Sequence, residues 1–302
     1  MDEGYRFVEA LMNIKIPLAA ALLMVSLAAF AKSPRTASPT PLPAATFDSV
    51  AYGTHPRQKI DVWLPANASE PSPVVVFVHG GGFTKGDRKD KRLAARIPKC
   101  LASGIALVSV GYRFLQDADG AKPPVKACLD DVMAALNLIR SKAREWNIDA
   151  GRMGLTGGSA GGCACLFAAL SNDNALGIKV VYAEYSQTSL DPKEMRKWIP
   201  NSNYGAGLFG YGDFQTWLDR RDEVLPWIEK FSASVLLRRC TPQKAPLILF
   251  SGPKAPPPGE LDKDPTHSGT FNVKLQEIAH GCGVPCRRGN DGDLLSALKS
   301  PR

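Results

Sequence analysis

From Phe47 onward, short apolar runs alternate with stretches of helical periodicity. Val74 to Val78 is a continuous apolar run, typical of a strand that is buried on both faces of a sheet. Similar runs predict further strands at 59–64, 105–110, 153–156, 179–182, 246–250 and 284–287, and helices are predicted over 91–103, 123–146, 163–170 and 271–282. This alternation predicts an α/β fold, with a mostly parallel sheet and helices on both of its faces.

Residues 187–240 interrupt the alternation between two predicted strands. They contain Trp198, Trp217 and Trp227, and the stretch 213–230 has helical character. An insertion late in such a fold would lie over the ends of the strands, so we predict a small helical lid that lines a substrate pocket. The alternative is a pair of helices that packs outside the pocket.

The N-terminal region has the pattern of a secretory leader. Lys15 precedes an apolar stretch from Ile16 to Phe30, and a small-x-small sequence ends at Ala31. We predict a signal peptide over 1–31, which implies a periplasmic or secreted protein. A membrane anchor is the alternative, although the stretch is short for a bilayer span, and no stable span is expected after cleavage.

The residues around this leader complete the predicted domain organisation. Residues 1–11 are acidic and fit a leader poorly, so they could be a start-site artefact. Residues 32–46 are rich in Pro and Ser and predict an extended linker. Residues 47–302 then form one catalytic domain.

Charge and cysteine content narrow the possible partners. The net charge of +8 comes from 37 basic and 29 acidic residues that are scattered along the chain. No basic run is interleaved with aromatic residues, so no nucleic-acid partner is predicted. The seven cysteines match no zinc pattern, and their odd number leaves at least one unpaired, although Cys282 and Cys286 could pair locally.

A Gly-rich segment, Gly157-Gly158-Ser159-Ala160-Gly161-Gly162, lies between a predicted strand and a predicted helix. Glycines on both sides of a serine permit a sharp strand-to-helix turn that exposes the hydroxyl near a helix N-terminus. A phosphate-binding loop is the alternative, but no Gly-Lys-Ser/Thr sequence follows. The segment therefore predicts Ser159 as a nucleophile.

A second Gly-rich loop, His79-Gly80-Gly81-Gly82, directly follows the buried strand that ends at Val78. Acyl transfer develops negative charge on an oxygen, which backbone N–H groups can stabilise. We predict Gly81, Gly82 and Ala160 as the donors of this oxyanion hole. His79 is then a residue that shapes the loop and not the catalytic base.

Together, these motifs resemble the α/β-hydrolase esterases of the hormone-sensitive-lipase type and their secreted bacterial carbohydrate-esterase relatives. The resemblance spans roughly residues 47–284, and the segments that carry it are 52–53, 61–65, 79–82, 111–113, 149–155 and 157–162. It implies the α/β-hydrolase fold and hydrolysis of carboxylic esters, with short acyl groups on small molecules or carbohydrates as substrates. It implies no metal and no organic cofactor. It places the catalytic acid at Asp264, with Asp262 in reserve.

The catalytic histidine of that family follows the last strand, where this sequence has none. The chain contains only His55, His79, His267 and His280. His267, three residues after Asp264, is the candidate base. Two alternatives remain: residues 287–302 are short, basic and unlike a strand–helix ending, which suggests a damaged gene end, or the chain is a non-catalytic binding protein. An exported serine peptidase is a further alternative.

Overall fold

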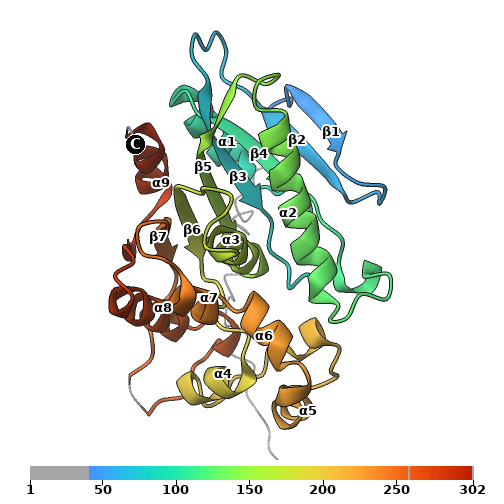
Figure 1. Ribbon diagram of the computed structural model, residues 1–302, viewed down its shortest axis with the longest axis vertical. Coiled ribbons are helices and arrows are strands. Elements are labelled where there is room, and N and C mark those ends of the chain that lie inside the picture. The colour runs from blue at the N-terminus through green and yellow to red at the C-terminus, as the bar shows by residue number, and fades with distance from the viewer. Residues whose placement is uncertain (1–40, 258, 301–302) are drawn as a thin grey trace, which may run out of the picture. The chain divides into compact units, whose positions relative to one another are not determined.

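The computed structural model describes residues 41–257 and 259–300. Its strands form one eight-stranded sheet in the order β1-β2-β4-β3-β5-β6-β7-β8 (Figure 1). The strands are β1 (Phe47–Ala51), β2 (Lys59–Trp63), β3 (Ser72–Val78), β4 (Ala106–Val110), β5 (Ile148–Gly158), β6 (Val180–Glu184), β7 (Leu247–Ser251) and β8 (Cys286–Arg288). The helices are α1 (Leu93–Ala102), α2 (Val125–Ser141), α3 (Ala160–Leu170), α4 (Pro192–Trp198), α5 (Phe214–Asp219), α6 (Leu225–Phe231), α7 (Ala233–Arg239), α8 (Gly269–Gly281) and α9 (Asp291–Lys299).

The sheet is mostly parallel, as the sequence predicts. Only the pairs β1–β2 and β2–β4 are antiparallel, and the strands β4, β3, β5, β6, β7 and β8 are parallel to one another. Most predicted bounds shift by one or two residues, and three elements change more at one end. Strand β5 is longer than 153–156, α2 ends before 146, and α3 begins before 163. Strand β1 has no counterpart among the predicted elements.

Helices cover both faces of the sheet, and side chains that alternate along β3 separate two apolar layers. Val74, Val76 and Val78 pack with residues of α2, α3, α7 and α8. Val75 and Phe77 point to the opposite face, where they pack with residues of α1 and α9. Burial on both faces of the sheet explains the continuous apolar run from Val74 to Val78 in β3.

The prediction that residues 287–302 are unlike a strand–helix ending is wrong. Strand β8 pairs with β7, and α9 follows after two residues. Asn290 caps α9 by accepting hydrogen bonds from the backbone of Gly292 and Asp293, and the Asp293 side chain accepts one from the Asn290 backbone. Leu294 and Leu298 are buried. A capping box and two leucines one helical turn apart outweigh the basic composition.

All seven cysteines lie in the described part of the chain and are free thiols, so the local pairing between Cys282 and Cys286 is not formed. Cys286 is buried within β8, whereas Cys282 is partly exposed at the end of α8. Burial raises the pKa of the Cys286 thiol to about 12. A thiol that remains protonated is a poor nucleophile for disulfide exchange.

The predicted insertion, 187–240, contains α4 to α7. Figure 1 shows α4, α5 and α6 grouped beyond the ends of the central strands. Aromatic residues pack the segment internally. Trp217 is fully buried, and its ring stacks on that of Phe209 with 5.1 Å between centroids. The predicted leader and most of the predicted linker lie outside the described residues, and none of the described helices is long and apolar enough to cross a membrane.

Candidate active site

Ser159 occupies a sharp turn between β5 and α3. Its backbone has φ 53° and ψ −126°, a conformation that is strained for a residue with a side chain. The neighbouring glycines are required because the turn packs closely against the end of β3. A Cβ atom on Gly161 would lie 2.1 Å from the Val78 carbonyl oxygen, and one on Gly157 would lie 2.5 Å from it. The turn therefore holds Ser159 at the carboxyl edge of the sheet.

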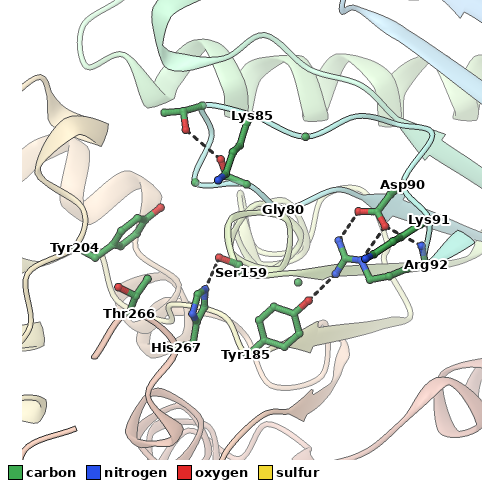
Figure 2. Close-up of a pocket in the computed structure, with 15 residues that line it drawn as sticks. Gly80, Lys85, Asp90, Lys91, Arg92, Ser159, Tyr185, Tyr204, Thr266 and His267 are labelled. Atoms are coloured by element: carbon green, nitrogen blue, oxygen red, sulfur yellow. Dashed lines mark hydrogen bonds and ion pairs between the residues drawn. The ribbon is translucent and has the colours of Figure 1, made fainter. Parts of the chain in front are cut away.

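The structure brings Ser159, His267 and Asp264 together in one hydrogen-bonded chain. The Ser159 Oγ atom lies 3.0 Å from His267 Nε2, and His267 Nδ1 lies 2.8 Å from Asp264 Oδ2 (Figure 2 shows the first pair). A carboxylate only accepts hydrogen bonds, so Nδ1 carries the proton and Nε2 is left to accept one from the serine. In serine hydrolases, a serine–histidine–carboxylate chain of this kind serves to activate the hydroxyl.

A single short turn positions both His267 and Asp264. Asp264 precedes a 3-10 turn, Pro265–His267, and its carboxylate also accepts a hydrogen bond from the backbone N–H of His267, with an N–O distance of 3.3 Å. Two residues of the insertion hold this loop. The side chain of Gln187 donates to the Thr266 carbonyl, and that of Asn201 donates to the Asp262 carbonyl over 2.8 Å.

The two acidic residues of this loop differ in environment. Asp264 has a side chain that is 61% exposed, and the hydrogen bond from His267 lowers its pKa below the ordinary value. Asp262 does not bond to His267. Its Oδ1 atom accepts from the Asp264 backbone N–H over 3.0 Å, and its Oδ2 atom is buried without a partner among the described residues.

The other three histidines are bonded elsewhere. His79 is buried, stacks on Tyr112 with ring centroids 4.3 Å apart, and its Nδ1–H donates to the Gly80 carbonyl over 2.8 Å. Burial lowers its pKa, which favours the neutral ring. His280 donates to the Cys286 carbonyl, and His55 accepts from the Arg57 backbone. All four histidines are in the described residues, and His267 alone is hydrogen-bonded to Ser159.

The predicted oxyanion loop lies against the serine turn. A Cβ atom on Gly80 would lie 2.6 Å from the Gly158 carbonyl oxygen, so the two loops touch there. Gly81 and Gly82 have φ values of 113° and 63°, and the Gly81 carbonyl accepts from the backbone N–H of Lys85 over 3.1 Å. Ala160 is the first residue of α3, where a backbone N–H has no acceptor within the helix.

These loops border an open pocket of about 870 Å³. Figure 2 shows Ser159 near its centre, with Tyr204 on one side and Tyr185 and Arg92 on the other. The pocket is lined by Gly80, Gly81, Gly82, Thr84, Lys85, Gly86, Asp90, Lys91, Arg92, Gly158, Ser159, Tyr185, Tyr204, Thr266 and His267. Within the described residues, no group of three or more His, Cys, Asp or Glu side chains is arranged to hold a metal ion.

Several residues of this site have no motif in the sequence. Tyr185 directly follows β6. Binding residues gather at the carboxyl ends of parallel strands, so the position of Tyr185 in the sequence could have predicted that it lies in the site. Arg92, Gln187 and Tyr204 approach from a loop or from the insertion. Only the folded chain shows that Arg92 and Tyr204 line the pocket around Ser159 and that Gln187 holds the loop of His267.

A strained serine between a strand and a helix, on a mostly parallel eight-stranded sheet, defines an α/β-hydrolase fold. The chain can be placed more closely within that class. The BD-FAE family model matches residues 60–217, just over half of the 302 residues, and the chain belongs to the BD-FAE family.

Curated relatives support this placement over part of their length. Carboxylesterase NlhH of Mycobacterium tuberculosis is 34% identical over 115 residues, which are 38% of this chain and 34% of that protein. Esterase LipI of the same species is 35% identical over 101 residues, 33% of this chain and 30% of LipI. The chain thus spans about a third of the length of these relatives.

Solved structures share the fold at low sequence identity. A truncated carbohydrate esterase from gut microbiota superposes with a TM-score of 0.59 and 17% identity, covering 85% of this chain and 94% of that one. Est2, an esterase of Thermogutta terrifontis with propionate bound, gives a TM-score of 0.58 and 17% identity, and covers 82% of both chains.

Proposed function

We propose that the protein hydrolyses carboxylic esters through an acyl-enzyme on Ser159. The observation that carries this proposal is the hydrogen bond between Ser159 and His267, in a site where His267 in turn bonds to Asp264. Membership of the BD-FAE family and curated relatives that are named carboxylesterase and esterase support the same chemistry.

The proposed reaction has two halves. Ser159 Oγ attacks the ester carbonyl carbon while His267 Nε2 accepts its proton, and the backbone N–H groups of Gly81, Gly82 and Ala160 stabilise the oxyanion. The bond to the alcohol oxygen then breaks, and His267 protonates the departing alcohol. Water attacks the acyl-enzyme by the same route. The acid leaves, and the proton returns to Ser159.

Within this class we propose small-molecule or carbohydrate esters with short acyl groups as substrates. The shared fold of a carbohydrate esterase and of an esterase described with propionate and with butyrate supports this range. Export to the periplasm or the medium is part of the proposal, and it rests on the leader pattern before Ala31. Residues 187–240 are proposed as the lid, since Tyr204 lines the pocket and Gln187 holds the loop of His267.

The alternatives have less support. The non-catalytic binding protein was suggested by the lack of a histidine after the last strand, but His267 lies within 3.0 Å of Ser159. No observation specifically favours a peptidase.

Covalent labelling tests the nucleophile. A fluorophosphonate is expected to attach one label per chain, on the peptide that contains Ser159, because an activated serine attacks phosphorus as it attacks a carbonyl. Mass spectrometry of the digested protein locates the label. Ser159→Ala should remain unlabelled, whereas Ser141→Ala, which changes an exposed serine at the end of α2, should label normally. Labelling at another serine would contradict the assignment.

Asp264→Asn is expected to lower kcat by roughly 10- to 100-fold, less than the ~10⁴-fold known for a buried triad aspartate. Because the Asp264 side chain is 61% exposed, water screens its charge from the imidazolium that forms at His267. The measurement is steady-state hydrolysis of p-nitrophenyl acetate.

Asp262→Asn is the matched control for this change. Asp262 has no bond to His267, so its replacement should cost less activity than that of Asp264. A larger loss in Asp262→Asn would reassign the acid to Asp262.

A further inference from the structure

The guanidinium group of Arg92 lies directly beside the serine turn. A Cβ atom on Gly158, the residue before the nucleophile, would lie 2.7 Å from Arg92 Nη1 and 2.5 Å from the Tyr185 hydroxyl oxygen. Figure 2 shows Arg92 and Tyr185 on the same side of Ser159, at the pocket wall opposite Tyr204. A cationic group therefore borders the place where an ester would react.

Arg92 is fixed by contacts on several sides. Its Nε and Nη2 atoms donate to the two carboxylate oxygens of Asp90 over 3.0 and 2.8 Å, and Nη1 donates to the Tyr185 hydroxyl oxygen over 2.7 Å. The guanidinium also lies 5.3 Å from the centroid of the Phe77 ring. Tyr185 has a positive φ of 39°, a conformation that costs energy and is typically retained at functional sites.

This arrangement leaves unused hydrogen-bond donors on two residues that line the pocket. Three of the five guanidinium N–H groups are used in these bonds, so Nη1 and Nη2 each keep one. The Tyr185 oxygen accepts from Arg92, which leaves its own O–H free to donate. The Arg92 side chain is 30% exposed, so a ligand in the pocket can reach it.

The charges around the pocket are unbalanced. Lys85, Lys91 and Arg92 line it against one carboxylate, Asp90, and that carboxylate is occupied by Arg92. Neither lysine has an ion-pair partner among the residues that the structure describes. Asp87, on the same loop, is not among the lining residues. The polar wall beside Ser159 thus presents mainly donors and positive charge.

We propose that Arg92 and Tyr185 form a subsite that binds a carboxylate carried by the ester substrate, with Lys85 and Lys91 attracting it. This inference rests on the proposed esterase function and specifies its substrate class as anionic esters. A guanidinium edge that is already oriented by Asp90 matches a carboxylate through charge-assisted hydrogen bonds. The surplus positive charge raises the local concentration of anionic substrates.

Matched substrates test the proposal. The pair 3-carboxyphenyl acetate and 3-carbamoylphenyl acetate places the charge on the alcohol side, and mono-p-nitrophenyl adipate with its monoamide places it on the acyl side. We expect kcat/KM to be at least about tenfold higher for the anionic member of one pair, and Arg92→Gln to lower that ratio by roughly 10- to 100-fold. Salt should reduce the ratio in the wild type.

Lys89→Gln is the matched control, because it removes one charge from the same loop, where Lys89 pairs with Asp48 away from the pocket. Its ratio should equal that of the wild type. If Arg92→Gln does not fold, as judged by its melting temperature, the double variant of the exposed residues Lys85 and Lys91 to glutamine should lower the ratio a few-fold at low salt.

The results distinguish failure of the carboxylate subsite from failure of the proposed esterase function. A wild-type ratio near one for both pairs, or equal losses on both members of a pair in Arg92→Gln, would overturn the carboxylate subsite and leave Arg92 a structural role. In either case, turnover of the neutral esters that requires Ser159 would leave the esterase function standing. Absence of any turnover that requires Ser159 would overturn both.

Discussion

His267→Ala is expected to lower kcat for p-nitrophenyl acetate by at least about 10⁴-fold, which is as much as Ser159→Ala. His267 supplies the hydrogen-bond acceptor within 3.0 Å of Ser159 Oγ, and none of the other three histidines bonds to this serine. Without a base, the serine hydroxyl must lose its proton to water, and the nucleophile is then weak. The oxyanion donors would account for the remaining rate.

A double variant tests whether Ser159 and His267 act as one unit. Residues that act as one unit give losses that do not add, so Ser159→Ala with His267→Ala should be about as slow as either single variant. Steady-state rates of the three variants, corrected for spontaneous hydrolysis, give the comparison. His280→Ala is the control, because its ring donates to the Cys286 carbonyl and does not contact Ser159. Activity retained in His267→Ala but lost in His280→Ala would show that the base is misassigned.

The position of His267 shows what the sequence could and could not predict. The two Gly-rich motifs predicted Ser159 and the 79–82 loop, which the structure places side by side, since each motif follows a strand with a clear apolar run. The histidine lay outside the position that the resemblance implied, three residues after Asp264. The contact of His267 with Ser159 depends on the 3-10 turn Pro265–His267. It also depends on Gln187, which is distant in sequence and bonds to the Thr266 carbonyl. No local pattern predicts that contact.

The C-terminal segment was misjudged for a different reason. Its basic composition is unlike that of a buried strand and helix, but its local pattern predicts them. Asn290 and Asp293 have the spacing of a capping box, and Leu294 and Leu298 are one turn apart. Short elements carry few residues, so composition easily outweighs pattern in judging them. Arg92 had neither kind of signal, because its role depends on the approach of its loop to Tyr185 after folding.

Gly81→Ala is expected to lower kcat by roughly 10²- to 10³-fold, the loss that follows when an oxyanion donor is removed or displaced. Gly81 has φ 113°, where a side chain is strained, and its Cβ atom would lie 2.1 Å from the Lys85 carbonyl oxygen. That oxygen belongs to the backbone, so the loop itself must move. The backbone N–H groups of Gly81 and Gly82 would then no longer point at the oxyanion.

The measurement must distinguish a Gly81→Ala protein that folds with a displaced loop from one that does not fold. Titration with a fluorophosphonate counts the chains that still fold around Ser159, and kcat is then calculated per labelled site. Gly207→Ala is the control, because its φ is not positive and no heavy atom lies within 4 Å of the added Cβ. If Gly81→Ala kept the wild-type kcat per labelled site, these N–H groups would not be the oxyanion donors. The positive φ of Gly81 would then serve only the turn that its carbonyl closes with Lys85.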